Sequence, residues 1–455
     1  MTAARSDREA SATADSGASQ LALDLPVELP RLQIEPDWKL QPRLWGHSFH
    51  PMCSYLASFP AALAHAFVAR YSRPGDVVLD PFSGRGTAPL QAAAEGRIGV
   101  GNDLNPFAWC LTAAKLEPAT PAEVATRITA LRLAYRAVVR AWRSRAADVQ
   151  ATAGRAEPGS VPTEVAVAFH PRTFAEVLFL RETLRLDDRV DRHIAAAMTG
   201  ILHGKSPAYL STLMPNTFSM APRYVREYAA RTGYAAPERD TFALLEAKMR
   251  RLQRDPAPRG PGLALLGDAR DAGARSRAAL RTAGLPDRAR LVVTSPPYLR
   301  VLRYGYYNWL RTWFLGLDGS AIDASLDAAH HRAPYLAFMR EVLAGLRQAL
   351  TDDAVVVLVI GEVATDRGHA VDGIGLADRV WEAAARPEGY RLAGVAVDEV
   401  DPNRKMTRLW GDEAGRATAR DRILVLGATE AGRRRALAGA PLPVDWTWPP
   451  RLRSL

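Results

Sequence analysis

The chain has 455 residues and a formal net charge of +10, with 59 lysines and arginines against 49 aspartates and glutamates. This length accommodates one large domain with an insertion, or two or three units with separate cores. The 48% share of hydrophobic residues excludes collagen-like, fibrous and fully disordered classes. Two cysteines, Cys53 and Cys110, allow neither a disulfide framework nor a cysteine-rich zinc site, so we expect no bound metal.

The distribution of apolar residues also bears on location and partners. No apolar run approaches the roughly 18–20 residues that cross a bilayer, which predicts a cytoplasmic protein without a membrane partner. A positive excess suits a polyanionic partner, although charge alone does not identify one.

Residues 1–38 are rich in alanine, serine and aspartate, then interrupted by prolines, which predicts a disordered leader. Beyond them, short apolar runs alternate with helical stretches. Continuous rather than alternating apolar runs are typical of strands covered by helices on both faces of a sheet. The pattern predicts an α/β fold with a seven-stranded, doubly wound, Rossmann-like sheet. The seven strands are expected at residues 77–79, 98–101, 263–266, 291–294, 354–360, 392–398 and 423–426.

Residues 116–255 interrupt this alternation, because they contain helical patterns and no convincing strand, and we expect a helical insertion there. The flanking ranges 39–115 and 256–430 are then two parts of one sheet domain, and 431–455 is a C-terminal tail. The first helix of the insertion is expected to carry an apolar stripe of Val124, Ile128, Leu131, Tyr135, Val138 and Trp142. A second stripe holds Arg132, Arg136, Arg140 and Arg143, either a solvated face or a phosphate-facing surface.

The first predicted strand runs directly into a glycine-containing turn, Asp80-Pro-Phe-Ser-Gly84-Arg-Gly86-Thr87. Glycines there let a ligand approach the backbone closely. Asp103 ends the next strand, where a carboxylate can accept the hydroxyls of a ribose. A dinucleotide would need a third small residue where Pro89 stands, whereas an acid at position 80 suits an ammonium group. These features together favour S-adenosylmethionine as the cofactor.

The fourth predicted strand ends in Ser295-Pro296-Pro297-Tyr298. Two prolines make the turn rigid, and they remove amide donors while leaving carbonyl acceptors. Such a pocket suits a planar exocyclic amine. Ser295 and the Pro296 carbonyl would accept its hydrogens, and Tyr298 would stack on its ring.

The pair of motifs, Asp-Pro-Phe-Ser-Gly-Arg-Gly-Thr and Thr-Ser-Pro-Pro-Tyr, resembles the amino-group DNA methyltransferases, which methylate cytosine N4 or adenine N6. The resemblance covers roughly residues 47–115 and 263–430, and implies a class I methyltransferase sheet. It also implies catalytic roles for residues 295–298 and a flipped base in double-stranded DNA that accepts the methyl group directly. A restriction endonuclease is a partner that this family allows. The implied cofactor-binding residues are Phe59, Asp80, Phe82, Gly84, Gly86, Thr87, Asp103 and Asp268, the last beside the adenine amine.

The chain departs from the family in two respects. The serine-proline segment follows the glycine turn, which is the reverse of the order in many cytosine-N4 enzymes. The insertion at 116–255, for which the resemblance implies target recognition, comes earlier than the usual target-recognition segment. Serine rather than aspartate at position 295 favours cytosine N4 over adenine N6, although either residue can accept from an amine. An RNA amino-methyltransferase and a non-catalytic DNA-binding protein on the same scaffold remain alternatives.

Two further segments combine aromatic or basic residues in a way that suits nucleic acid. Residues 300–314 interleave arginines with aromatic residues. There, Tyr304 and Tyr306 are candidates for contact with the target base, whereas Trp309, Trp313 and Phe314 are expected to pack against the sheet. Between the sixth and seventh strands, Arg404, Lys405 and Arg408 are candidates for contact with the DNA backbone.

Overall fold

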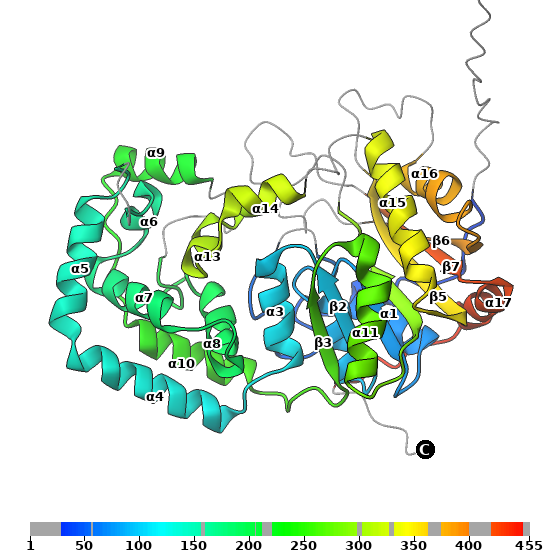
Figure 1. Cartoon of the computed structure of the whole chain (residues 1–455), viewed down its shortest axis with the longest axis horizontal. Coiled ribbons are helices and arrows are strands. Elements are labelled where there is room, and N and C mark those ends of the chain that lie inside the picture. Colours follow the sequence, from blue (N-terminus) through cyan, green and yellow to red (C-terminus); the bar gives the residue numbers. More distant parts are fainter. Residues whose placement is uncertain are drawn as a thin grey trace, which may run out of the picture.

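A computed structural model of the chain describes residues 29–55, 58–155, 160–204, 206–211, 221–297, 303–326, 332–362, 375–399 and 420–448. These residues form a sheet domain with a helical lobe beside it (Figure 1). Within them, no helix is both long and apolar enough to span a membrane. No group of three or more His, Cys, Asp or Glu side chains in the same ranges is placed to hold a metal ion.

The sheet has seven strands in the order β3-β2-β1-β4-β5-β7-β6. Strand β7 runs antiparallel to β5 and β6, and the other neighbouring strands pair in parallel. This confirms the seven strands and the doubly wound α/β class, and the strand order with one antiparallel strand is that of class I methyltransferases. The strands are β1 (Val77–Asp80), β2 (Ile98–Asp103), β3 (Gly262–Leu266), β4 (Ala289–Thr294), β5 (Leu350–Glu362), β6 (Arg391–Glu399) and β7 (Arg420–Gly427).

Helices cover both faces of the sheet, as the continuous apolar runs predict. On β5, residues 355, 357 and 359 enter one core and residues 356, 358 and 360 the other. One face carries α1 (Ala61–Tyr71), α2 (Thr87–Ala94), η1 (Asp37–Leu40) and α17 (Glu430–Gly439). The other carries α11 (Ala272–Thr282), η2 (Ala269–Asp271), α15 (Arg332–Arg347), α16 (Leu376–Val380) and η4 (Trp381–Ala385).

Both chain ends of the described region belong to the sheet domain, which corrects two expected boundaries. Leu32 and Trp38, within the expected leader, are buried, and the Leu32 amide donates to the carbonyl of Val395 at 2.9 Å. This contact pairs the outer edge of β6, so residues 29–38 are structured because they cover that edge. The expected tail likewise contains α17, which packs on β5 and β7, and Trp446, whose ring lies 5.5 Å from that of Trp45.

The helical lobe contains α4 (Pro121–Ala137), α5 (Val139–Ala151), α6 (Thr163–Ala168), α7 (Pro171–Thr183), α8 (Arg189–Thr199), α9 (Pro222–Thr232) and α10 (Thr241–Leu252). The expected first helix is two helices, because Val138 leaves helical geometry at φ −126° and is exposed. Its predicted apolar stripe is otherwise buried or half-buried. The arginine stripe is not wholly outward, since Arg132 pairs with Glu246 at 3.0 Å.

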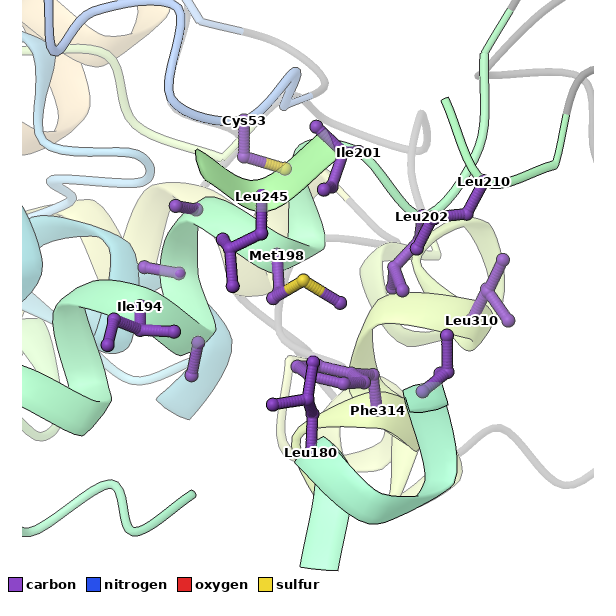
Figure 2. Packing of buried hydrophobic residues seen from close by; sticks show 14 of the residues in the cluster. Cys53, Leu180, Ile194, Met198, Ile201, Leu202, Leu210, Leu245, Leu310 and Phe314 are labelled. Atoms are coloured by element: carbon purple, nitrogen blue, oxygen red, sulfur yellow. The ribbon is translucent and has the colours of Figure 1, made fainter. Parts of the chain in front are cut away.

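The lobe also takes in a segment that follows the fourth strand, comprising α12 (Tyr304–Tyr307), α13 (Trp309–Phe314) and α14 (Gly319–Ser325). Figure 2 shows Leu310 and Phe314 beside Leu180, Met198 and other side chains of the insertion. Trp313 stacks on Phe174 of α7 with ring centroids 6.0 Å apart. The expectation that these aromatics pack against the sheet is therefore wrong, because they fill the core of the lobe.

The lobe is joined to the sheet domain through α3 (Pro106–Leu116), which contacts β2 and β3 on one side and α8 on the other. Helix α3 begins after Asn105, whose side chain accepts a hydrogen bond from the Phe107 amide. Its fixed start places α3 directly behind the glycine turn that follows β1.

Candidate active site

The candidate site lies at the carboxyl edge of the parallel strands, where open α/β sheets bind ligands. Asp80 is the last residue of β1 and Asp103 the last of β2. Asp268 comes two residues after β3, and Ser295 immediately follows β4. The strand order places these four residues on adjacent strands, so the structure brings them together at one edge.

The turn after β1 needs its two glycines, because Gly84 and Gly86 have φ values of 50° and 75°. A Cβ on Gly86 would also lie 2.7 Å from Oγ1 of Thr112. Two side chains of α3 fix the turn from behind. Thr112 donates to the carbonyl of Gly84 at 3.1 Å, and Lys115 donates to the carbonyl of Arg85 at 2.5 Å.

The sequence did not single out Lys115, although the side chain is fully buried. Burial away from carboxylates lowers the pKa of its ammonium well below the ordinary value. A lysine usually extends into solvent, and no sequence pattern distinguishes this one from a surface residue.

Asp103 is held in place by backbone amides. The Gly84 amide donates to Oδ2 at 2.7 Å and the Asn105 amide to Oδ1 at 2.9 Å. Desolvation outweighs these bonds and raises the pKa of the carboxyl group to about 6. Each carboxylate oxygen can accept further hydrogen bonds, which suits the two hydroxyls of a ribose.

Asp80 is almost completely buried, with 2% of its surface exposed. Its Oδ1 accepts from the hydroxyl of Thr294 at 2.6 Å and from the Phe82 amide at 3.1 Å. Desolvation raises the pKa of Asp80 to about 7, and the bond from Thr294 partly opposes this rise. A buried acid without a cationic partner among the described side chains suits a ligand that brings a positive charge. The sequence analysis did not assign Thr294, which contacts Asp80 here, although it opens the Thr-Ser-Pro-Pro-Tyr motif.

Asp268 occupies the expected position after β3, but its carboxylate is engaged. Arg270 donates to it through the backbone amide at 2.9 Å and through Nη2 at 2.7 Å. This guanidinium holds the pKa of Asp268 below its ordinary range. An ionised, oriented carboxylate can still accept from an adenine amine, because each oxygen offers more than one acceptor direction.

The remaining expected cofactor residues are close to this edge or beneath it. Thr87 is the first residue of α2 and is buried. The Phe82 ring lies beside Phe338 of α15, with centroids 5.9 Å apart, and is half-buried. Phe59 lies just before α1 and is buried in the core on that face of the sheet.

The serine-proline turn begins directly beside β5. The Ser295 hydroxyl donates to the carbonyl of Val359 at 3.0 Å. Because its single proton is used there, the Ser295 oxygen presents its lone pairs outward as an acceptor. Pro296 is buried and Pro297 half-buried. Tyr298 lies outside the described residues, as do Arg404, Lys405 and Arg408.

An aromatic pair lies next to the glycine turn. Tyr55 and Tyr304 stack with ring centroids 5.7 Å apart. The Tyr55 hydroxyl accepts from Nδ2 of Asn105 at 3.2 Å, and its ring is the neighbour nearest to a Cβ added at Gly84. The expected residue Tyr304 therefore lies at the glycine turn, together with Tyr55.

Tyr306 lies at the first turn of α12, farther along the same segment. The guanidinium of Arg303 is 4.9 Å from the centre of its ring. Asp323 accepts from the amides of Gly305 and Tyr306 at 2.7 and 3.0 Å, which fixes the start of the helix. Tyr306 is thus held on the lobe side of the edge.

The arrangement combines a sheet of class I methyltransferase topology with three acids and an acceptor serine at one edge. Residues 29–112 match the family model described as "DNA methylase". The chain is 34% identical over 71 residues to type II methyltransferase M.MjaII of Methanocaldococcus jannaschii, covering 16% of this chain and 13% of that protein. It is 38% identical over 64 residues to type II methyltransferase M.Cfr9I of Citrobacter freundii, covering 14% of this chain and 21% of that protein.

The family model covers the segment that bears the glycine turn. The two alignments span only 13% and 21% of the relatives' own length. A solved structure of TrmN from Thermus thermophilus is 13% identical, with a TM-score of 0.30, over 83% of this chain and 52% of that one. The fold assignment rests on the strand order of the sheet itself.

Proposed function

We propose that the protein is an S-adenosylmethionine-dependent DNA methyltransferase that modifies an exocyclic base amine, with cytosine N4 as the preferred acceptor. The observation that carries this proposal is the meeting of Asp80, Asp103 and Ser295 at one sheet edge, with the Ser295 proton already donated to Val359. The match to the DNA methylase family and the names of the curated relatives support the choice of DNA.

The chain offers a complementary group for each part of the cofactor. Asp80 would bind the ammonium, Asp103 the ribose hydroxyls and Asp268 the adenine amine, and the positive φ of Gly84 and Gly86 keeps the turn clear of side chains. When bound, the cofactor supplies an electrophilic methyl group on a sulfonium.

The serine-proline turn would position the acceptor amine. The Ser295 oxygen and the Pro296 carbonyl accept the two amine hydrogens, so the nitrogen lone pair is directed toward the methyl donor. Tyr298 would stack on the base. The base would have to leave the duplex, because its amine is inaccessible within stacked, paired DNA. The Tyr55–Tyr304 pair beside the glycine turn suits the entry side of such a pocket.

The identity of the base and of the partners is part of the same proposal. Serine at position 295 favours cytosine over adenine, since the adenine pattern more often carries aspartate there. A restriction endonuclease that reads the same sequence stays a prediction, as do the contacts of Arg404, Lys405 and Arg408 with the DNA backbone.

The test is methyl transfer from labelled S-adenosylmethionine to unmethylated DNA by the double variant Ser295→Ala with Tyr298→Ala. We expect loss of transfer by at least about a hundredfold with cofactor affinity retained, because neither side chain is assigned to the cofactor. Ser276→Ala removes another buried serine, in α11, and is expected to transfer normally. Unchanged transfer by the double variant would refute the assignment, and preferential transfer to matched RNA would replace DNA as the substrate.

A further inference from the structure

One buried amide connects the three strand ends that carry the acids. Asn102 is the penultimate residue of β2 and is fully buried. Its Nδ2 donates to the carbonyl of Pro81 at 3.2 Å and to the carbonyl of Gly267 at 2.8 Å. Its Oδ1 accepts from Nη1 of Arg275 at 3.2 Å. Both amide protons and the oxygen are therefore used, as a buried amide requires.

Each bonded group is next to a site acid in the sequence. Pro81 follows Asp80, Gly267 precedes Asp268, and Asn102 itself precedes Asp103. A single side chain thus spans the ends of β1, β2 and β3.

The Asn102 amide acts where the regular pairing of the strands ends. The last paired residues are Asp80 with Gly101 and Asp103 with Leu266. Beyond them, Pro81 has no amide proton with which to continue a ladder. Two backbone bonds follow these pairs, from the Ser83 amide to the Asn102 carbonyl and from the Gly267 amide to the Asp103 carbonyl, both at 2.9 Å. The Asn102 side chain adds a bond to a carbonyl on each neighbouring strand end, so the spacing of the three strand ends depends in part on it.

Arg275 of α11 supports this amide from the far side. Besides Oδ1 of Asn102, its guanidinium donates to the carbonyl of Asp268 at 3.1 Å. A Cβ on Gly267 would lie 2.3 Å from Cζ of Arg275, so glycine at 267 leaves the space that the guanidinium occupies. Arg275 therefore fixes both the amide orientation and the backbone that bears Asp268.

We propose that Asn102 is a positioning residue of the cofactor site, which sets the distances between Asp80, Asp103 and Asp268. The cofactor assignment of these acids rests on the proposed function. A ligand that bridges all three acids requires them at fixed separations, whereas methyl transfer once the cofactor is bound depends on the turn after β4. Loss of the Asn102 amide should therefore affect binding of the cofactor and leave the chemical step intact.

The test is Asn102→Asp in the full chain, which keeps the size of the side chain and replaces the donor with an oxygen facing two carbonyls. We expect the Kd for S-adenosylmethionine, measured by calorimetry, to rise about tenfold or more. The single-turnover rate of transfer at saturating cofactor is expected to stay within about threefold. A purely structural role would lower Tm without this separation of Kd from rate.

Gln150→Glu is the matched control, because Nε2 of Gln150 also donates to two backbone carbonyls, of Ala166 and Phe169, but within the helical lobe. An equal rise in Kd in both variants would overturn the proposal. If Asn102→Asp does not fold, Arg275→Met removes the bonds to Oδ1 of Asn102 and to the Asp268 carbonyl, keeps the Asn102 amide, and is expected to raise the Kd about threefold. An unchanged Kd for S-adenosylmethionine in Arg275→Met would also overturn the proposal.

The outcome for the wild-type protein separates this inference from the proposed function. Wild-type protein that binds S-adenosylmethionine without methylating nucleic acid would refute the proposed function, and the comparison of Kd values would still decide the role of Asn102. Wild-type protein that does not bind the cofactor would refute both.

Discussion

Replacement of Asp80 by asparagine should stabilise the protein at neutral and alkaline pH while abolishing cofactor binding. Asparagine keeps an oxygen that can accept from Thr294 and from the Phe82 amide, and it removes the buried charge. In the folded protein the pKa of Asp80 is about 7, against an ordinary value of 3.8. Between pH 3.8 and about 7, Asp80 is therefore protonated in the folded state and ionised in the unfolded state. The free energy of unfolding consequently falls as the pH rises from about 4 to about 7.

The size of the effect follows from the difference between the two pKa values. At about 1.4 kcal/mol per pKa unit, the rise from 3.8 to about 7 corresponds to about 4 kcal/mol as an upper bound. The free energy of unfolding of Asp80→Asn, relative to that of the wild type, should therefore rise by up to about 4 kcal/mol between pH 4 and pH 8. Urea denaturation at both pH values measures this gain. If the free energies of unfolding of variant and wild type differ by the same amount at pH 4 and at pH 8, the reasoning is refuted.

The same carboxylate predicts how cofactor binding depends on pH. An ammonium group binds the ionised form, so protonation of Asp80 competes with binding below about pH 7. For wild type, the Kd should be roughly eightfold higher at pH 6 than at pH 7.5. Asp398→Asn is the control, because Asp398 is also buried but pairs with Lys39 at 3.1 Å, away from the site. A flat wild-type profile, or a loss of binding by the control, would contradict this role of Asp80.

Two further substitutions test the surroundings of the acids. Thr294→Val removes the hydroxyl that lowers the pKa of Asp80, so the pH midpoint of cofactor binding should move above about 7. Calorimetry over a range of pH values measures this midpoint. A shift of the midpoint to lower pH would contradict the role of Thr294. Gly86→Ala should cost at least about 2–3 kcal/mol in urea denaturation and weaken cofactor binding, because φ is 75° and the new Cβ would lie 2.7 Å from Oγ1 of Thr112. Gly284→Ala, at φ 67° with no atom within 4 Å of the new Cβ, should cost only about 1–2 kcal/mol; equal costs would refute the contribution of the close contact.

The sequence predicted the sheet well because its strands are buried on both faces. Such strands are continuous apolar runs, and their detection does not depend on the exact register. The acids at the strand ends follow from the same reasoning, since the carboxyl edge of a parallel sheet is where the chain turns. The sequence alone therefore predicts that Asp80, Asp103 and Ser295 lie at one edge of the sheet.

The features that were missed depend on contacts between distant segments. Lys115 and Asn102 are polar residues in an α-helix and a strand, and only tertiary structure shows that both are buried and bonded to the turns beside the acids. The hydrogen bond between Arg270 and Asp268 could not be predicted either, because Asp-Ala-Arg is an ordinary surface sequence. The placement of Trp313 was wrong for the same reason, since its partner Phe174 lies far away in the chain.

The central claim is tested most directly by identifying the methylated nucleoside. Purified protein would be incubated with labelled S-adenosylmethionine and mixed-sequence unmethylated DNA, and the DNA digested and analysed by mass spectrometry. The account predicts N4-methylcytosine. N6-methyladenine would keep the mechanism and overturn the choice of base, whereas the absence of any methylated nucleoside, with cofactor bound, would contradict the assignment as a DNA methyltransferase.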